Sequence, residues 1–203
     1  MKKNLSQENI LNQTFKELEK YDNIIAYDVE SEDLTKLCQA MSAEYMMLDL
    51  RVSNELKDKF LKYYNVTSLP CIISYNVIIY NDENFEKNMG LASKKKKESI
   101  YRKINSIINK DGVTLFIKGT PERPECGYTR QLIELLNKYN FIDGRNYNYF
   151  NIFMDNDIRE ELKIINQWPT FPQIYIKGIF EGGLDILKQM DKEGILENKL
   201  KGK

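Results

Sequence analysis

Cys126 stands where a proline-containing loop gives way to an amphipathic helix, in the segment TLFIKGTPERPECGYTRQLIELL. At such a position the backbone N–H groups of the first helical turn point at the sulfur, and nearby Lys118 and Arg130 would add positive charge, which favours a thiolate. The thiolate is the form of cysteine that attacks disulfides and binds metals. Gly127 leaves room for a bulky ligand. The position therefore predicts a nucleophile or metal ligand rather than a buried structural cysteine.

Two absences limit the chemistry available to this thiol. The chain of 203 residues contains no histidine, the commonest general base and the commonest neutral metal ligand. Cys-His catalysis, Ser-His-Asp catalysis and His-containing zinc sites are therefore excluded. Thr129 stands where dithiol oxidoreductases have a second cysteine, so an internal disulfide cannot form there. Any thiol chemistry must rely on backbone dipoles, Lys, Arg and an imported group.

The residues around Cys126 resemble the KGTPxxPxCGFS signature of monothiol glutaredoxins, with Tyr128 in the place of Phe and Thr129 in the place of Ser. Farther along, WPTFPQIYIKGIFEGGLDIL resembles the family's WPTFPQxYxxGxxxGGxDI almost position for position. The resemblance covers roughly residues 98–198, which is about half of the chain. It implies a thioredoxin fold that binds glutathione as a cofactor.

In this family the tripeptide pairs as an added strand with the backbone that precedes a cis proline, here Phe171 before Pro172. The glutathione-binding residues that the resemblance implies are Lys118, Cys126, Tyr128, Arg159, Thr170, Phe171, Pro172, Gly183, Leu184 and Asp185.

The resemblance also assigns the two charged ends of glutathione. Lys118 and Arg159 would hold the glycine carboxylate, while the Leu184 backbone and Asp185 would hold the γ-glutamyl end at a helix N-terminus. Taken singly, Lys118 reads as a solvated strand end, Arg159 as a surface ion pair and Asp185 as a helix cap. Trp168 reads as core packing rather than a ligand contact. The joint occurrence at family spacing favours the binding roles.

The resemblance implies that two protomers and two glutathiones supply four sulfurs for a 2Fe-2S cluster, with Cys126 as the protein's metal ligand. The implied partners are a second copy of this chain, iron–sulfur client proteins and BolA-like proteins. The alternative is a weak glutathione-dependent thiol–disulfide oxidoreductase with Cys126 as the catalytic nucleophile. Some relatives carry another cysteine where this chain has Leu184, so no resolving thiol is evident. A structural adaptor with an idle Cys126 is a third reading.

Composition narrows the partners and the compartment. Lys plus Arg and Asp plus Glu each number 30, so no overall field would steer the chain toward nucleic acid or an anionic membrane. No apolar run approaches the roughly 18 residues of a membrane span, and the first residues lack the apolar stretch of a signal peptide. Three cysteines are too few for a secreted disulfide framework. We expect a reducing compartment, the cytoplasm, with the nucleus as an addition.

The elements around these residues occur twice. From Asn23 the chain runs strand, helix, strand, helix and two short β-rich runs, the first of which follows Pro70. The second half repeats this order, with Pro172 placed as Pro70 is. The fold class is therefore α/β, with two thioredoxin-fold domains in tandem, each a central mixed sheet flanked by helices. The runs of the second half are VTLFIKG, TRQLIELLNKY, YNYFNIF, DIREELKIINQ and WPTFPQIYIKGIFEGG.

We divide the chain into residues 1–95, a thioredoxin-like domain that ends in a Lys-rich linker, and residues 96–203, the monothiol glutaredoxin domain. The Lys run in SKKKKESIYRKINSIIN would oppose the helix dipole in a first turn, so the linker is predicted to last until a helix begins near Glu98. That helix should pack on the second sheet. Its apolar face consists of Ile100, Ile104, Ile107 and Ile108.

The first domain lacks the chemistry of a thioredoxin. VESEDLTKLC stands where thioredoxins have Cys-x-x-Cys, so disulfide exchange there is not expected. Cys38 should lie along a helix, and Cys71, directly after Pro70, should be buried. The domain resembles the inactive thioredoxin-like half of multidomain monothiol glutaredoxins, which implies a docking role.

Overall fold

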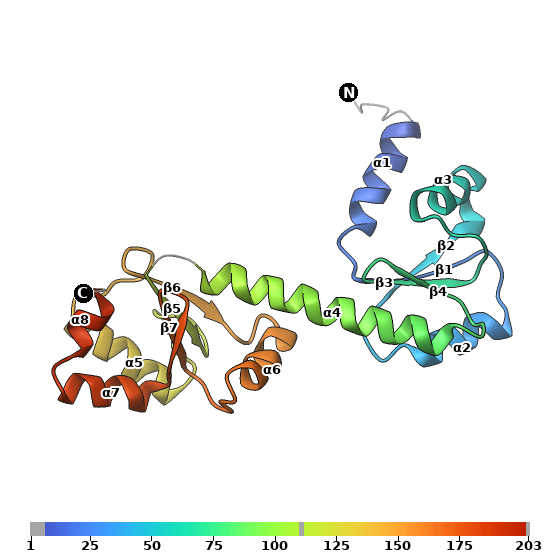
Figure 1. Ribbon diagram of the computed structural model, residues 1–203. Coiled ribbons are helices and arrows are strands. Elements are labelled where there is room, and N and C mark those ends of the chain that lie inside the picture. Colours follow the sequence, from blue (N-terminus) through green and yellow to red (C-terminus); the bar gives the residue numbers. More distant parts are fainter. Residues whose placement is uncertain (1–6, 110–111, 202–203) are drawn as a thin grey trace, which may run out of the picture. The chain divides into compact units, whose positions relative to one another are not determined.

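The computed structural model describes residues 7–109 and 112–201. The chain divides into two compact units between Lys97 and Glu98. Each unit contains a four-stranded mixed sheet, with strand order β2-β1-β3-β4 in the first and β6-β5-β7-β8 in the second (Figure 1). In both sheets the first pair is parallel and the other pairs are antiparallel. The predicted fold class, two thioredoxin-like α/β domains, is confirmed.

In the first unit, the middle of β1 (residues 24–26) is apolar and buried, because helices cover both faces of its sheet. Helices α1 and α3 pack on one face through Phe15 and Phe60, and α2 packs on the other through Leu37. The elements are α1 (Gln7–Leu18), β1 (Asn23–Tyr27), α2 (Glu32–Ala40), β2 (Met46–Asp49), a 3-10 turn (Leu50–Val52), α3 (Asn54–Tyr64), β3 (Cys71–Ser74) and β4 (Val77–Ile79).

In the second unit, the central strand β5 is buried at every position. Helices α5, α7 and α8 cover one face of its sheet, and α6 with the last turns of α4 covers the other. The elements are β5 (Val113–Ile117), α5 (Gly127–Lys138), β6 (Tyr147–Asn151), α6 (Asn156–Ile165), β7 (Gln173–Ile176), β8 (Ile179–Gly182), α7 (Leu184–Lys192) and α8 (Leu196–Leu200).

The prediction of a Lys-rich linker is wrong. Helix α4 is continuous over Phe85–Ile108, so the four lysines of 94–97 lie in its interior. They stand more than two turns from the helix start, where the dipole that opposes lysine has little effect, and lysine is a good helix former. Ala92 belongs to the first core, whereas Ile100, Ile104 and Ile108 pack on the second sheet as predicted.

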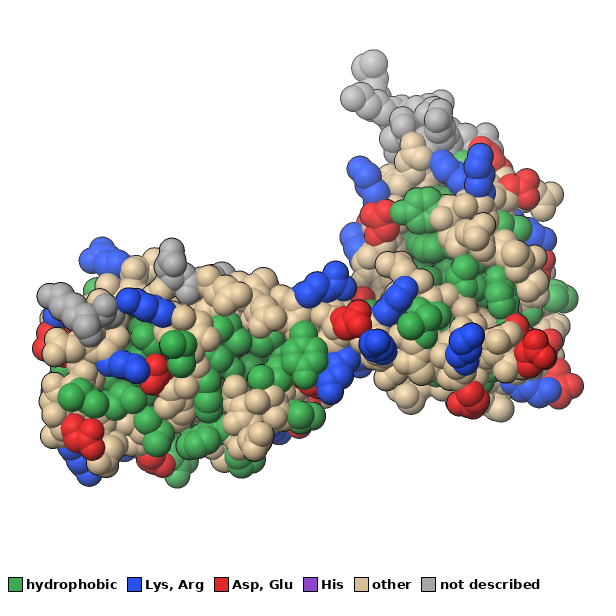
Figure 2. Space-filling view, in the orientation of Figure 1, with side chains coloured by type: hydrophobic (Ala, Val, Ile, Leu, Met, Phe, Trp, Pro, Cys, Tyr) green, Lys and Arg blue, Asp and Glu red, His purple; other side chains and the backbone are tan. Residues whose placement is uncertain are grey.

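Charged side chains of both signs are interspersed on the face shown in Figure 2. None of the helices in the described ranges is both long enough and apolar enough to span a bilayer. The Leu69–Pro70 and Phe171–Pro172 peptide bonds are cis, as expected from the two corresponding positions.

Candidate functional site

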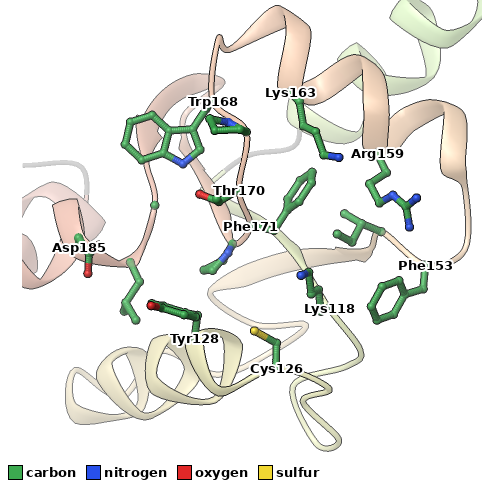
Figure 3. Close-up of a pocket in the computed structure, with 15 residues that line it drawn as sticks. Lys118, Cys126, Tyr128, Phe153, Arg159, Lys163, Trp168, Thr170, Phe171 and Asp185 are labelled. Carbon is green, nitrogen blue, oxygen red and sulfur yellow. The ribbon is translucent and has the colours of Figure 1, made fainter.

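All ten residues predicted to bind glutathione lie on one cleft of about 580 Å³ in the second unit (Figure 3). The cleft opens between the start of α5, the end of β6, the side of α6, the 168–172 loop and the start of α7. Five further lining residues were not predicted as ligand contacts. These are Ile152, Phe153, Lys163, Trp168 and Pro169.

Cys126 is the N-cap residue of α5, as its position in the sequence predicted. Its backbone is extended, with φ −150° and ψ 141°, and its side chain makes no capping hydrogen bond. The first turn of α5 carries no acidic side chain, so the positive end of the helix dipole is not neutralised locally. Cys126 is half-buried on the cleft wall. The Cys126 side chain therefore lies on the cleft wall, at the N-terminus of a helix.

Thr129 lies in the first turn of α5 and is fully buried. The Lys118 backbone N–H donates to Thr129 Oγ1 at 3.3 Å, which ties the end of β5 to the first turn of α5. A hydroxyl in this position cannot resolve a mixed disulfide at Cys126. The residue that replaces a second cysteine thus has a structural contact of its own.

The loop before Cys126 is folded tightly on itself. Gly119 has φ +83°, and a Cβ there would lie 2.4 Å from the Arg123 carbonyl oxygen, so only glycine fits. The Gly119 and Phe153 backbone N–H groups both donate to Asn151 Oδ1 at 3.1 Å. Residues 119–125 are all described, and none of them lines the cleft. The Glu125 backbone N–H donates to the Lys118 carbonyl oxygen at 3.0 Å, so the loop links the segments that carry Lys118 and Cys126.

One end of the cleft is cationic. Lys118 comes from the end of β5, and Arg159 and Lys163 come from one face of α6, where their spacing of four residues makes them neighbours. Arg159 Nε and Lys163 Nζ each donate to Glu160, at 3.0 and 2.9 Å. Lys163 and then Arg159 hold the pKa of this exposed carboxyl below its usual range. The sequence signal for Lys163 was its i+4 spacing from Arg159.

The opposite end of the cleft is formed by the start of α7. The N-cap of α7 is Gly183, which has no side chain to cap the helix. Asp185 is exposed in the first turn. A Cβ on Gly183 would lie 3.3 Å from the Pro172 carbonyl oxygen, so the glycine permits close approach of the two segments. The backbone N–H and C=O of Phe171 make no hydrogen bond to any part of residues 7–109 or 112–201. Both features are suited to a peptide ligand.

Trp168 was predicted to be a core residue, and it has two roles. Its ring packs edge-on against Phe180 with centroids 5.8 Å apart, and it also lines the cleft. In Figure 3 Trp168 lies on the wall between Asp185 and the cationic side chains.

The cysteines of the first unit differ from Cys126. Cys71 is fully buried after Pro70, as predicted, and burial raises the pKa of its thiol to about 12. Cys38 is half-buried on α2, with its sulfur 4.0 Å from Met47 Sδ. Within the described ranges, there is no group of three or more Cys, Asp or Glu side chains that could hold a metal ion.

Comparison with known proteins matches residues 113–181 to the glutaredoxin family model. A probable monothiol glutaredoxin 2 of Rickettsia prowazekii is 43% identical over 98 residues, which are 48% of this chain and 88% of that protein. Glutaredoxin 3 of Danio rerio is 32% identical over 176 residues, which are 85% of this chain and 53% of that protein. The latter match is longer than the second unit, so it extends into the first.

The chain spans about half the length of the longer curated relatives that it matches. Among solved structures, a monomeric truncated mutant of Trypanosoma brucei 1-C-Grx1 is 36% identical, with a TM-score of 0.43 over 50% of this chain and 88% of that one.

Proposed function

We propose that this chain, which belongs to the monothiol glutaredoxin family, binds glutathione in the cleft at Cys126 and shares a 2Fe-2S cluster with a second copy. The observation that carries the proposal is the arrangement of charge along the cleft. Cys126 lies between a cationic end and an end formed by a helix N-terminus with a carboxylate. That order matches the order of groups along glutathione.

Glutathione has a glycine carboxylate at one end, a thiol in the middle, and an amine and a second carboxylate at the γ-glutamyl end. Lys118 and Arg159, with Lys163 beside them, can hold the glycine carboxylate through charge-assisted hydrogen bonds. At the other end the free N–H groups of α7 suit the γ-glutamyl carboxylate, and Asp185 suits the amine. The unpaired backbone of Phe171 can bond the middle of the tripeptide as an added strand.

The residues of the cleft also fit a shared cluster. A 2Fe-2S cluster requires four sulfur ligands, and one protomer offers only Cys126 at this cleft. Bound glutathione places a second thiol beside it, and a second protomer with its own glutathione completes the set. The proposed recipients of the cluster are iron–sulfur client proteins, and BolA-like proteins are proposed as further partners. What this chain supplies is the accessible thiolate and the two charged ends that hold each glutathione.

The alternative function is reduction of glutathione mixed disulfides. In that reaction Cys126 thiolate attacks the glutathione sulfur of the mixed disulfide, the substrate thiolate leaves and takes up a proton, and Cys126 is left disulfide-bonded to glutathione. A second glutathione thiolate then attacks that glutathione sulfur, which releases oxidised glutathione and restores the Cys126 thiolate. None of residues 119–125 lines the cleft, so the loop gives no reason for slow turnover. Slow turnover is still expected, because Thr129 and Leu184 provide no resolving thiol.

Anaerobic reconstitution of the full chain with iron, sulfide and glutathione tests the proposal. We expect visible absorption typical of a 2Fe-2S cluster, glutathione in equal amount to protein, and a change from monomer to dimer on sizing. A protein that binds glutathione without a cluster, and turns over mixed disulfides as fast as a dithiol glutaredoxin, would favour the reductase instead.

A further inference from the structure

Gln173 is a polar residue in a place where an apolar one would ordinarily stand. It is the first residue of β7 and is fully buried, as are Ile174, Tyr175 and Ile176 after it. A buried amide costs free energy of desolvation unless its polar atoms find partners, and an apolar side chain carries no such cost. A buried amide at this position is therefore expected to have hydrogen-bond partners.

The amide of Gln173 is bonded on both sides. Its Nε2 donates to the Trp168 carbonyl oxygen at 3.0 Å and to the Thr170 carbonyl oxygen at 3.4 Å. Its Oε1 accepts a hydrogen bond from Asn166 Nδ2 at 2.7 Å. Asn166 Nδ2 also donates to the Tyr175 hydroxyl at 2.5 Å. The Gln173 side chain thus holds both loop carbonyls, Asn166 holds Gln173, and Asn166 in turn bonds the Tyr175 hydroxyl.

The network joins two parts of the chain that line the cleft, helix α6 and the 168–172 loop. Asn166 is the C-cap residue of α6, the helix that carries Arg159 and Lys163. The two loop carbonyls flank the segment that leads to Phe171, whose backbone faces the cleft without a partner. Gln173 itself does not line the cleft. It can act on a ligand only through the loop and the helix.

We propose that Gln173 is a positioning residue, which with Asn166 and Tyr175 fixes the distance between the cationic side of the cleft and the peptide-pairing backbone of Phe171. This inference rests on the proposed function, because it assigns the network to the binding of glutathione. A peptide ligand that is held at both ends loses affinity when the two anchors shift relative to one another, since either the charged bonds or the backbone bonds must then lengthen.

The surroundings of the network make it rigid. The Tyr175 ring packs against Phe116 and Phe180, with centroids 5.6 and 5.4 Å away. Burial raises the pKa of Tyr175, so its hydroxyl stays neutral and can accept from Asn166. Satisfied buried polar networks of this kind favour a single arrangement, because every alternative leaves a buried group unpaired.

The test measures glutathione affinity by calorimetry on the full chain with Gln173→Leu, and Thr114→Val serves as the matched control. Thr114 is a buried polar residue of β5 in the same unit; it stands opposite Tyr175 across the sheet, but its hydroxyl donates to the Ile107 backbone carbonyl and not to the Gln173 network. We expect Gln173→Leu to raise the glutathione Kd about tenfold, which corresponds to roughly one lost hydrogen bond. Thr114→Val should lower the Tm without changing the Kd. The alkylation rate of Cys126 should be the same in both variants.

Two further measurements separate positioning from simple destabilisation. Hydrogen exchange without glutathione should become faster at residues 168–171 in Gln173→Leu and stay unchanged in β5. In Gln173→Glu, glutathione affinity should recover toward that of the parent as pH falls, because a protonated carboxyl can donate one bond to a loop carbonyl.

The outcomes decide between the two proposals. If the parent chain binds no glutathione, the proposed function fails, and the inference that depends on it fails too, while loop exchange still shows whether Gln173 holds the loop. If the parent binds glutathione and Gln173→Leu binds it equally well, only the positioning role is overturned. A loss of affinity that merely follows the fall in Tm, as large in Thr114→Val, would overturn it as well.

Discussion

The two units share one strand order but begin the helix after their central strand in opposite ways. In the first, Ser31 caps α2 by accepting from the Leu34 N–H at 3.1 Å, and Glu32 and Asp33 occupy the first turn. In the second, Cys126 caps α5 without a side-chain bond, and no acidic residue follows in the first turn. The first unit neutralises its own helix start, whereas the second leaves it open to a thiolate and a ligand.

The cations follow the same division. Arg51 of the first unit donates to both carboxylate oxygens of Asp49, and these hydrogen bonds lower the pKa of Asp49 to about 2. In the second unit Arg159 and Lys163 share one exposed carboxylate, that of Glu160. The comparison teaches that the two units pair their cations differently: Arg51 is held by both oxygens of one carboxylate, whereas Arg159 and Lys163 share an exposed carboxylate beside the cleft.

The largest effect is expected from removing the thiol. Cys126→Ser should abolish cluster formation on anaerobic reconstitution. Each protomer supplies one sulfur ligand, Cys126, so the substitution removes both protein ligands of the shared cluster. Cys38→Ser and Cys71→Ser should retain the cluster. Adding Ser31→Cys to Cys126→Ser should not restore it, since the start of α2 is acidic. A cluster regained in that double variant would break the comparison between the two helix starts.

The charged ends of the cleft come next. Arg159→Ala or Asp185→Ala should each weaken glutathione binding by roughly 1–3 kcal/mol, the range for charge-assisted hydrogen bonds, or about 5- to 150-fold in Kd. Calorimetry measures both. Arg145→Ala, an exposed cation of the same unit that does not line the cleft, is the matched control. Unchanged affinity in both cleft variants would show that Arg159 acts only as a surface ion pair and Asp185 only as a helix cap.

The fold and nine of the ten cleft residues were predictable because two long motifs fix both the chemistry and the spacing of elements, and Arg159, which lies between the motifs, was predicted from the family resemblance. What sequence reasoning missed depends on tertiary contacts. Helix α1 was not singled out, although Leu11, Phe15 and Leu18 follow helical spacing and pack on the first sheet. The Lys run was assigned to a linker because the position of the helix start was unknown. The bonds of Gln173 join residues from a helix end, a loop and a strand, which no local pattern displays.

Helix stability provides a smaller test of the same contrast. Ser31→Ala should destabilise the first unit by about 1 kcal/mol, the usual cost of losing an N-cap side chain. Cys126→Ser should instead stabilise the second unit, by up to about 1 kcal/mol, because serine is a preferred N-cap and cysteine makes no cap bond here. Trp168, the only tryptophan of the chain, reports unfolding of the second unit in urea. A destabilised second unit would mean that Cys126 has a packing role.

The smallest effect is expected from Glu160, the residue that Arg159 and Lys163 share, whereas Arg51 of the first unit is held by both oxygens of Asp49. Its carboxylate is 48% exposed and competes with a bound carboxylate for Arg159 and Lys163. Exposed ion pairs are weak, so Glu160→Gln should tighten glutathione binding by only about twofold at low salt. The gain should shrink as salt is raised, because solvent ions screen the same interaction. Calorimetry at two ionic strengths measures this difference. Weaker binding in Glu160→Gln would show that Glu160 orients Arg159 for the ligand, and the cationic end would then be as internally organised as its counterpart in the first unit.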